Sequence, residues 1–306
     1  MRSSPRFKRS VSRSVTRAAG CGVNPLLIVS ADDFGLTDGV CRAVLRGYRE
    51  GVVRATSLLA VGRSFDLAAR MLADHPGLDA GAHLAIVGED PPLLTAREIP
   101  TLVDRRGTFP LSYRTVVARA ARGRLDPDDV RREFTAQLDR IDGAGVTVSH
   151  LDTHQHTHLW PSVAVVLVEL AMARGVPGVR TPRSGRLLPV GAPVNLLSAR
   201  LRRRVGRAGL VTTSGYAGLD EAGAMDAAAV RSAVSGLAGS LPVTGGSVEI
   251  NTHPGEAGDP DLGRFDWGYR WSDELDMLAD PATLAFVTGL GYTLGSFRDL
   301  IDRAAQ

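Results

Sequence analysis

Short apolar runs rich in β-branched residues alternate along the chain with longer segments in which apolar residues recur every three or four positions. The first pattern predicts strands, and the second predicts amphipathic helices. Strands are expected at LLIVSA (26–31), ATSLLAV (55–61), LDAGAHLAI (78–86), VTVSHLD (146–152), GVRTP (178–182) and GSVEINTHPG (246–255). Helices are expected at 38–51, 64–75, 126–145, 161–175 and 226–241, followed by a helix, a strand and a closing helix over 281–301.

Strands that alternate with helices in this way are typical of βαβ units and a parallel sheet. Six or seven such units in a chain of 306 residues predict an α/β fold, a (β/α) barrel of irregular or seven-stranded form. An open doubly wound sheet is the alternative, although no G-x-G-x-x-G motif follows the first strand. Residues 88–110 are expected to form a long loop, and residues 184–225 are less regular.

The composition indicates a soluble protein with a full hydrophobic core, since 44% of the residues are apolar and 23% are charged. The longest apolar stretch, VAVVLVELAMA (163–173), is too short to cross a bilayer and contains Glu169, so no membrane span is expected. The two cysteines do not suggest a disulfide framework. These features together lead us to expect a cytoplasmic protein.

The excess of positive charge belongs to the first residues of the sequence. Residues 1–24 carry six Lys or Arg and no acidic residue, whereas residues 25–306 carry a net charge of −3. The basic residues therefore do not indicate a nucleic-acid-binding face, and no nucleic-acid partner is expected. We expect residues 1–24 to be a disordered basic tail, with a tether to membranes or nucleic acids as the weaker interpretation. Residues 25–306 are expected to form a single barrel domain.

Residues that can bind metal ions or transfer protons follow directly after four of the predicted strands. The first strand ends in SADDFG with Asp32 and Asp33, and the third ends in GAHL with His83. The middle strand continues into SHLDTHQHTH, and a late strand ends in NTHPG with His253. Because ligands gather at the carboxyl ends of parallel strands, we expect these four clusters to converge on one site.

Four of the seven histidines lie between Ser149 and Trp160. In an extended chain one face would carry His150, Asp152, His154, His156 and His158. Each motif alone has a simpler interpretation: a turn or helix cap for the Asp pair, a structural histidine after the third strand, a turn at THPG, and a polar strand end or adventitious metal binding for the histidine run. The occurrence of all four after strands favours a metal site.

A carboxylate and two imidazoles from distant strand ends would leave open coordination positions on a divalent ion, which is typical of a catalytic site. Such an ion polarises a carbonyl group and lowers the pKa of bound water. A second carboxylate beside the ligands could take a proton from that water, and a histidine could protonate the leaving group. The pattern therefore predicts a hydrolase.

The motifs SADDFGLTDGV, GAHLAI, HLDTHQHTHLWP and NTHPG, in this order, resemble the YdjC-like (ChbG-type) carbohydrate deacetylases. That family includes chitooligosaccharide deacetylase and a hopanoid-associated branch, and the resemblance covers the chain from residue 25 to about residue 300. It implies a (β/α) barrel related to the NodB-type polysaccharide deacetylases. It also implies metal-dependent hydrolysis of the N-acetyl group of an amino sugar, with release of acetate.

Carried over by motif, the resemblance makes Asp33, His83 and His154 the metal ligands. It makes Asp32 the catalytic base. His253 resembles the general acid that protonates the departing amine.

Further residues are expected to support this set. Arg180 would orient Asp32 or hold its charge, and His150 and Asp152 would orient the ligands. His156 is expected to line the pocket or to pack. Aromatic side chains could stack on sugar faces or simply pack in the core; the candidates are Trp160, Trp267, Tyr269 and Trp271.

Three positions depart from the pattern of the family. Ala82 stands where a bulkier residue is frequent, Ser30 where Asn is common, and Gln155 where many members have another His. These changes keep the reacting groups, although Ala82 and Ser30 could alter the pocket. Imidazole ligands favour Zn²⁺ or another transition metal, whereas the family is usually described with Mg²⁺, so both ions are kept as candidates.

The resemblance implies an N-acetylated amino sugar as the substrate. Two alternatives are hydrolysis of another amide, such as a lipid-linked (hopanoid-type) amino sugar, and a catalytically inactive sugar-binding barrel. A homodimer is the commonest assembly for a soluble oligomer of this kind.

Overall fold

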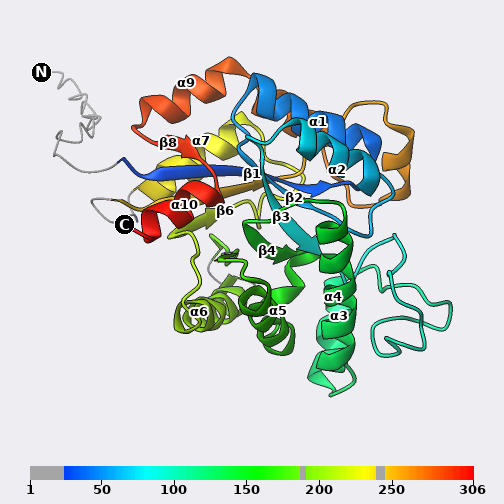
Figure 1. Cartoon of the computed structure of the whole chain (residues 1–306). Coiled ribbons are helices and arrows are strands. Elements are labelled where there is room, and N and C mark those ends of the chain that lie inside the picture. Colours follow the sequence, from blue (N-terminus) through cyan, green and yellow to red (C-terminus); the bar gives the residue numbers. More distant parts are fainter. Residues whose placement is uncertain (1–23, 187–190, 239–244) are drawn as a thin grey trace, which may run out of the picture.

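A computed structural model describes residues 24–186, 191–238 and 245–306. The basic tail expected over residues 1–24 lies outside these ranges, apart from its last residue. The described residues form one curled parallel sheet with helices packed around it (Figure 1). None of the described helices is long and apolar enough to cross a membrane.

The strands are β1 (Leu26–Phe34), β2 (Ala55–Leu58), β3 (Asp79–Leu84), β4 (His150–Thr153), β5 (Gly178–Val179), β6 (Gly215–Ala217), β7 (Ser247–Thr252) and β8 (Thr293–Gly295). The α-helices are α1 (Asp38–Glu50), α2 (Phe65–Asp74), α3 (Tyr113–Ala121), α4 (Pro127–Gly143), α5 (Pro161–Arg174), α6 (Gly191–Arg207), α7 (Ala227–Ala238), α8 (Trp271–Ala279), α9 (Pro281–Gly289) and α10 (Phe297–Ala304). Two 3₁₀ helices are η1 (His154–Leu159) and η2 (Pro260–Arg264).

Seven strands lie side by side in the order β5-β4-β3-β2-β1-β7-β6, and β8 pairs with the beginning of β1. Every pairing is parallel. The carboxyl ends of the strands therefore meet at one end of the sheet, as the sequence predicts.

The outer strands of this order are linked by a short additional segment. Val211 forms an isolated parallel bridge with Gly178 of β5. Its N–H donates to the oxygen of Pro177 at 2.8 Å, and its oxygen accepts from the N–H of Val179 at 3.0 Å. The chain continues from there to β6 at the other edge, so the sheet curls into a nearly closed barrel. The predicted (β/α) barrel of irregular, seven-stranded form is confirmed.

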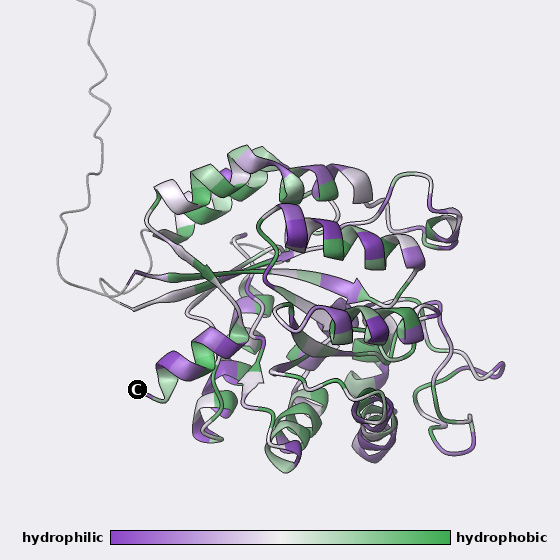
Figure 2. Ribbon diagram, turned by 45° about the horizontal axis from the view of Figure 1, so that its top comes forward, coloured by the Kyte–Doolittle hydropathy of each residue, from purple (hydrophilic) through white to green (hydrophobic). Residues whose placement is uncertain are grey.

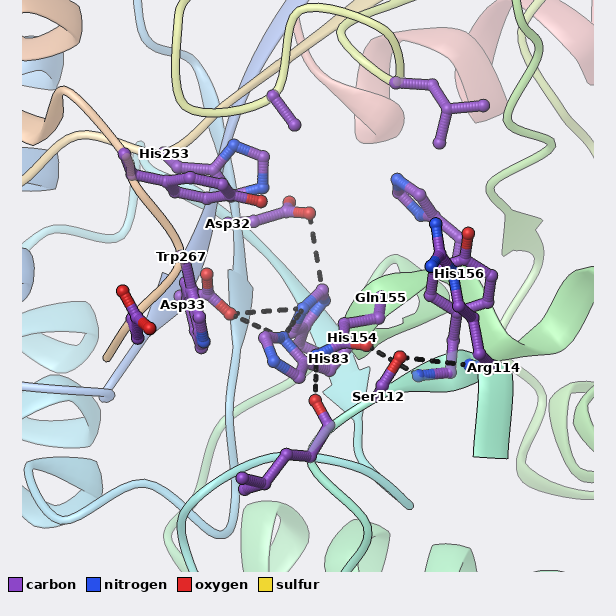
Figure 3. A pocket seen from close by; sticks show the side chains of 16 residues that line it. Asp32, Asp33, His83, Ser112, Arg114, His154, Gln155, His156, His253 and Trp267 are labelled. Carbon is purple, nitrogen blue, oxygen red and sulfur yellow. Dashed lines mark hydrogen bonds and ion pairs between the residues drawn. The ribbon is translucent and has the colours of Figure 1, made fainter. Parts of the chain in front are cut away.

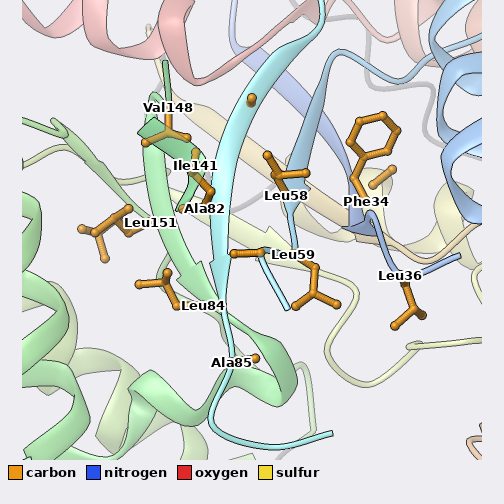
Figure 4. Packing of buried hydrophobic residues seen from close by; sticks show 14 of the residues in the cluster. Phe34, Leu36, Leu58, Leu59, Ala82, Leu84, Ala85, Ile141, Val148 and Leu151 are labelled. Atoms are coloured by element: carbon orange, nitrogen blue, oxygen red, sulfur yellow. The ribbon is translucent and has the colours of Figure 1, made fainter. Parts of the chain in front are cut away.

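The barrel strands are buried on both faces, because helices cover the outside and side chains, several of them polar, fill the inside. All nine residues of β1 are buried, as expected for a central parallel strand. Figure 2 shows helices with alternating hydrophilic and hydrophobic segments around a sheet that is hydrophobic over much of its length. Within the main core, Leu58, Ala82 and Leu151 of neighbouring strands belong to the same cluster as Ile141 of α4 (Figure 4).

Polar side chains link the first turns of α1 and α2. Thr37 caps α1, since its Oγ1 accepts the N–H of Val40 at 3.1 Å. Ser64 is the N-cap residue of α2, but its hydroxyl makes no capping bond and donates instead to Asp38 Oδ1 at 2.5 Å. That bond joins the starts of α1 and α2.

The structure differs from the predicted elements in several places. Strand β6 lies in the segment that was expected to be less regular, and it was not predicted. Helices α3 and α8 were not expected, and both lie in segments with many charged or turn-forming residues. The extended run of histidines was also expected to be longer. β4 ends at Thr153, because Gln155 and His156 have left-handed φ angles of 49° and 51°. The prediction that all five polar side chains from His150 onward share one face is therefore wrong beyond the end of β4.

Gly81 of β3 leaves room for a buried imidazole inside the barrel. A Cβ atom at this position would lie 2.3 Å from two ring atoms of His150. That ring cannot move aside easily, since it is fully buried and stacks on Phe297 with ring centres 3.8 Å apart. We expect Gly81→Ala to lower the free energy of unfolding by about 1–3 kcal/mol, as other overpacking substitutions do.

Urea unfolding followed by circular dichroism would measure this effect. Gly236→Ala is the matched control, because no atom lies within 4 Å of a Cβ at this exposed helical position. Replacement of a helical glycine by alanine should stabilise α7 by up to about 1 kcal/mol. Equal effects of the two substitutions would show that His150 does not constrain position 81.

Candidate active site

The end of β1 directs two adjacent carboxylates toward the same cavity. Successive side chains of a regular strand point to opposite faces. The pairing of β1 with β2 shifts its register between Ala31 and Phe34, and Asp33 has a left-handed φ of 61°. This irregularity lets Asp32 and Asp33 both line the cavity, where each is only 1% exposed. Aspartate tolerates this conformation better than most residues.

Three predicted ligands meet at the carboxyl ends of β1, β3 and β4. Asp33 Oδ1 lies 2.9 Å from His154 Nδ1 and 3.4 Å from His83 Nε2. The two ring nitrogens lie 3.3 Å apart. Each residue offers one ligand atom, and these atoms lie within 4.8 Å of one another. The predicted convergence of these strand ends is thus observed in the geometry (Figure 3).

The chemistry of this trio fits a divalent cation. Asp33 Oδ1 is buried, and neither imidazole contact gives it a hydrogen bond of normal geometry. Although burial alone would raise the pKa of Asp33, His154 and His83 hold it well below its ordinary value. A buried carboxylate oxygen without a hydrogen-bond donor is costly unless a cation contacts it.

Asp152 fixes the orientation of the His83 ring. Its Oδ1 lies 2.7 Å from His83 Nδ1, which directs Nε2 toward Asp33. This carboxylate–histidine arrangement is the one that supports metal ligands in many proteins. Burial disfavours the charged ring, but Asp152 and Asp32 raise the pKa of His83 to about 10. The acidic surroundings therefore attract a positive charge to this position, whether from a proton or from a metal ion.

Arg180 lies beneath the reacting groups and is completely buried. Its Nη1 and Nη2 donate to the two oxygens of Asp32 at 2.7 and 2.8 Å. It also forms ion pairs with Asp152 and with Glu249, the latter at 2.7 Å from Nε. Burial opposes the charge of Arg180, yet these carboxylates raise the pKa of its guanidinium well above the ordinary value. The predicted contact of Arg180 with Asp32 is present, and the guanidinium holds three carboxylates together.

Two glutamates, Glu249 and Glu274, support the site although they belong to none of the predicted clusters. Glu249 comes from the middle of β7 and points into the barrel, where it is fully buried against Arg180. Glu274 of α8 accepts the backbone N–H of His253 at 2.6 Å and that of Met225 at 3.1 Å. A glutamate among apolar strand residues in GSVEINT was the available signal for Glu249, whereas nothing in the sequence pairs Glu274 with His253.

His253 follows β7 and lines the cavity near Asp32 (Figure 3). It is 8% exposed, and its Nδ1 has no hydrogen-bond partner. Its ring centre lies 5.0 Å from that of Tyr269. An imidazole at the cavity wall can exchange a proton with a bound molecule.

The other members of the histidine run have different surroundings. His150 is buried below the cavity, and its Nε2 lies 3.3 Å from Ser57 Oγ. Burial lowers the pKa of His150 to about 4, so its ring is neutral near pH 7. His156 lines the cavity, with its Nε2 3.4 Å from the hydroxyl of Tyr216. Trp160 lies outside the cavity lining and packs against the hydrophobic core.

The cavity above the ligands has a volume of about 580 Å³, which is in the usual range for small-molecule sites. Trp267 and Tyr269 form part of its wall, whereas Trp271 packs against the core. The rest of the rim comes from the start of α3 and the segment before it, from η1, from the loop after β6 and from the segment between η2 and α8. Its residues include Leu111, Ser112, Tyr113, Arg114, Gln155, Leu219, Ala222 and Asp266.

Comparison with known proteins agrees with the resemblance drawn from the four sequence motifs. The model of a family described as YdjC-like protein matches residues 26–288, a stretch that contains all four motifs, and confirms the resemblance drawn from them. Carbohydrate deacetylase 1 of Listeria innocua is 41% identical over 150 residues, which are 49% of this chain and 58% of that protein. A carbohydrate deacetylase of Geobacillus stearothermophilus is 38% identical over 162 residues, 52% of this chain and 62% of that protein. The chain thus spans less than two thirds of these curated relatives.

A solved structure from Enterococcus faecalis V583, named for cellobiose-phosphate cleavage, has the same fold. Its TM-score is 0.74 at 22% sequence identity, and the match covers 90% of this chain and 99% of that one. At this identity the similarity supports the fold alone.

Burial makes Glu249 a source of pH-dependent stability. Although Arg180 opposes the effect, burial raises the pKa of Glu249 from 4.5 to about 7. A carboxyl group with a raised pKa in the folded state contributes stability below pH 4.5, and this contribution is lost as the pH rises through 7. We therefore expect Glu249→Gln to become more stable relative to the wild type across this interval, by about 1–3 kcal/mol in total.

Urea unfolding at several pH values, in the presence of a chelator, would measure this change. Glu169→Gln is a suitable control, since Glu169 forms a half-exposed ion pair with Arg131 and surface pairs contribute little to stability. A constant difference between Glu249→Gln and the wild type at every pH would contradict the assignment.

Proposed function

This chain belongs to the YdjC-like protein family, and we propose that it is a metal-dependent hydrolase that removes the N-acetyl group of an amino sugar and releases acetate. The observation that carries the proposal is the convergence of Asp33, His83 and His154 in one cavity with a second carboxylate and a free imidazole. The named carbohydrate deacetylases among its relatives support the same activity. Residues 25–306 would act as a single catalytic domain in the cytoplasm.

Asp33, His83 and His154 would hold one divalent ion. Two imidazoles among the three ligands favour Zn²⁺ or another transition metal, and the family resemblance keeps Mg²⁺ as a candidate. When bound, such an ion supplies Lewis acidity to the acetyl carbonyl and to water. The residues around the site supply the remaining chemistry.

Asp32 would act as the base that takes a proton from the attacking water. The two hydrogen bonds from Arg180 keep Asp32 in one orientation. Each carboxylate oxygen retains a lone pair for the water proton. As the water oxygen bonds to the carbonyl carbon, the proton passes to Asp32.

His253 would complete the reaction by protonating the amine nitrogen as the carbon–nitrogen bond breaks. Its position on the cavity wall supports this role. The backbone bond to Glu274 fixes the residue at the end of β7. Acetate and a sugar with a free amino group would then leave the cavity, while Trp267 and Tyr269 would contact the sugar ring.

Removal of one ligand should abolish both metal binding and acetate release. Metal analysis of the purified wild-type protein should find about one divalent ion per chain under this one-metal proposal. In Asp33→Ala neither the ion nor acetate production should remain. Asp66→Ala is the control, because that carboxylate is 80% exposed and lies outside the cavity lining. Normal acetate release by Asp33→Ala would contradict the proposed site.

Removal of the proposed acid should separate metal binding from turnover. His253→Gln should bind the ion with unchanged stoichiometry, since His253 is not among the three grouped ligands. Its kcat should fall by about 10²–10⁴, the usual contribution of a general acid. An enzymatic acetate assay would measure the loss, and an unchanged kcat would exclude His253 from proton transfer.

A panel of N-acetyl compounds would identify the substrate. It should contain N-acetylglucosamine, its oligomers, and nucleotide-linked and lipid-linked N-acetyl sugars. We expect acetate release from at least one unlinked amino sugar. Release from the lipid-linked sugars alone would favour the alternative substrate class, and binding without release from any compound would favour an inactive sugar-binding barrel.

A further inference from the structure

The residue that follows His154 fixes one wall of the cavity. We propose that Gln155 is a positioning residue that holds the segment Leu111–Arg114 in place to receive the part of a saccharide that extends beyond the N-acetylated ring. This inference rests on the proposed function, and it assigns a role to Gln155 at the rim of the saccharide site rather than a new substrate.

The backbone of η1 directs the side chains of His154, Gln155 and His156 to three different places. Gln155 and His156 both have left-handed φ and ψ angles, which are unfavourable for residues other than glycine. The turn places His154 beside Asp33 and His156 on the cavity lining, with Gln155 facing the rim between them (Figure 3). Such strained conformations persist where surrounding contacts fix them.

The side-chain amide of Gln155 provides such contacts. Its Oε1 accepts the backbone N–H of Tyr113 at 2.8 Å, and its Nε2 donates to the oxygen of Leu111 at 3.0 Å. Tyr113 is the first residue of α3, where an N–H has no partner within the helix. The next N–H, that of Arg114, is accepted by Ser112 Oγ at 3.2 Å. Gln155 therefore completes the cap of α3 from a distant part of the chain.

The wall held in this way faces Trp267 across the ligand cluster (Figure 3). Leu111 is 64% exposed and Tyr113 is 45% exposed, although both line the cavity. Large apolar side chains left open at a cavity rim are typical of ligand contacts. The N-acetyl group must lie beside the ligands and His253, so this rim is available to a second sugar ring, whose apolar face suits leucine and tyrosine.

Only a side chain with an acceptor and a donor on one planar group can make both bonds. Glutamate retains the acceptor for Tyr113 and loses the donor for Leu111. Asparagine keeps both groups and tolerates the left-handed backbone, but it is one methylene shorter. The variants Gln155→Glu, Gln155→Asn and Gln155→Ala thus separate the two hydrogen bonds from the backbone strain.

Amide hydrogen exchange tests the contact without reference to activity. In Gln155→Ala and Gln155→Asn the amide of Tyr113 should exchange about tenfold faster or more, since it loses its acceptor. In Gln155→Glu its protection should remain. Arg122→Gln, at the other end of α3, is the control and should leave this amide unchanged. Wild-type protection of Tyr113 in Gln155→Ala would overturn the proposed contact.

Calorimetry on the zinc-loaded protein, in a His253→Gln background that prevents turnover, tests this role of Gln155. The probes are N-acetylglucosamine and its β-1,4-linked dimer. Gln155→Ala should weaken binding of the dimer about tenfold, the value of one or two hydrogen bonds, and should weaken binding of the single sugar at least fivefold less.

The possible outcomes separate this inference from the proposed function. An equal loss for both sugars, or a changed zinc stoichiometry, would show that Gln155 acts through His154 and would overturn the inference alone. If the protein with Gln155 intact binds neither sugar, the inference fails together with the assignment of an N-acetyl sugar site. Zinc binding and tight dimer binding that depend on Gln155 would support both.

Discussion

The site depends on one buried guanidinium that neutralises several carboxylates. Arg180 contacts Asp32 of β1, Asp152 of β4 and Glu249 of β7 inside the barrel. Buried charges are tolerated only when they are paired and hydrogen-bonded, so each carboxylate requires the same partner. Because Asp152 also orients His83, the guanidinium is connected through a single side chain to the candidate metal ligands. A surface salt bridge could not impose this arrangement, since water would screen it.

The sequence predicted the positions where strands end more reliably than the contacts inside the barrel. Parallel strands place their carboxyl ends together, which is why the motifs that contain Asp33, His83 and His154 could be grouped from their positions along the chain. The choice of these three residues as ligands came from the family resemblance. Glu249 was missed because it lies in the middle of a strand and not at its end, although a glutamate among apolar residues of a strand was a signal in the sequence. Helix α3 was missed because its start is stabilised by Gln155, 42 positions away, as well as by its own Ser112.

In the histidine-rich segment, too, the sequence predicted the location of the residues but not their contacts. Its regular spacing suggested one shared face, but two left-handed residues end the strand geometry after Thr153. His150 became a neutral interior residue, His154 a candidate ligand and His156 a wall residue. Residue type and spacing identified this segment as part of a candidate site. The backbone dihedral angles, which the sequence did not predict, direct its side chains to different surroundings.

The register shift at the end of β1 has a chemical consequence. Asp32 and Asp33 are the same amino acid at adjacent positions, yet one contacts a guanidinium and the other contacts two imidazoles. Nothing in their side chains distinguishes them; the left-handed turn at Asp33 does. The backbone conformation at Asp33 thus gives two identical side chains different contacts. A change in this local conformation could remove the difference even if every reactive side chain were retained.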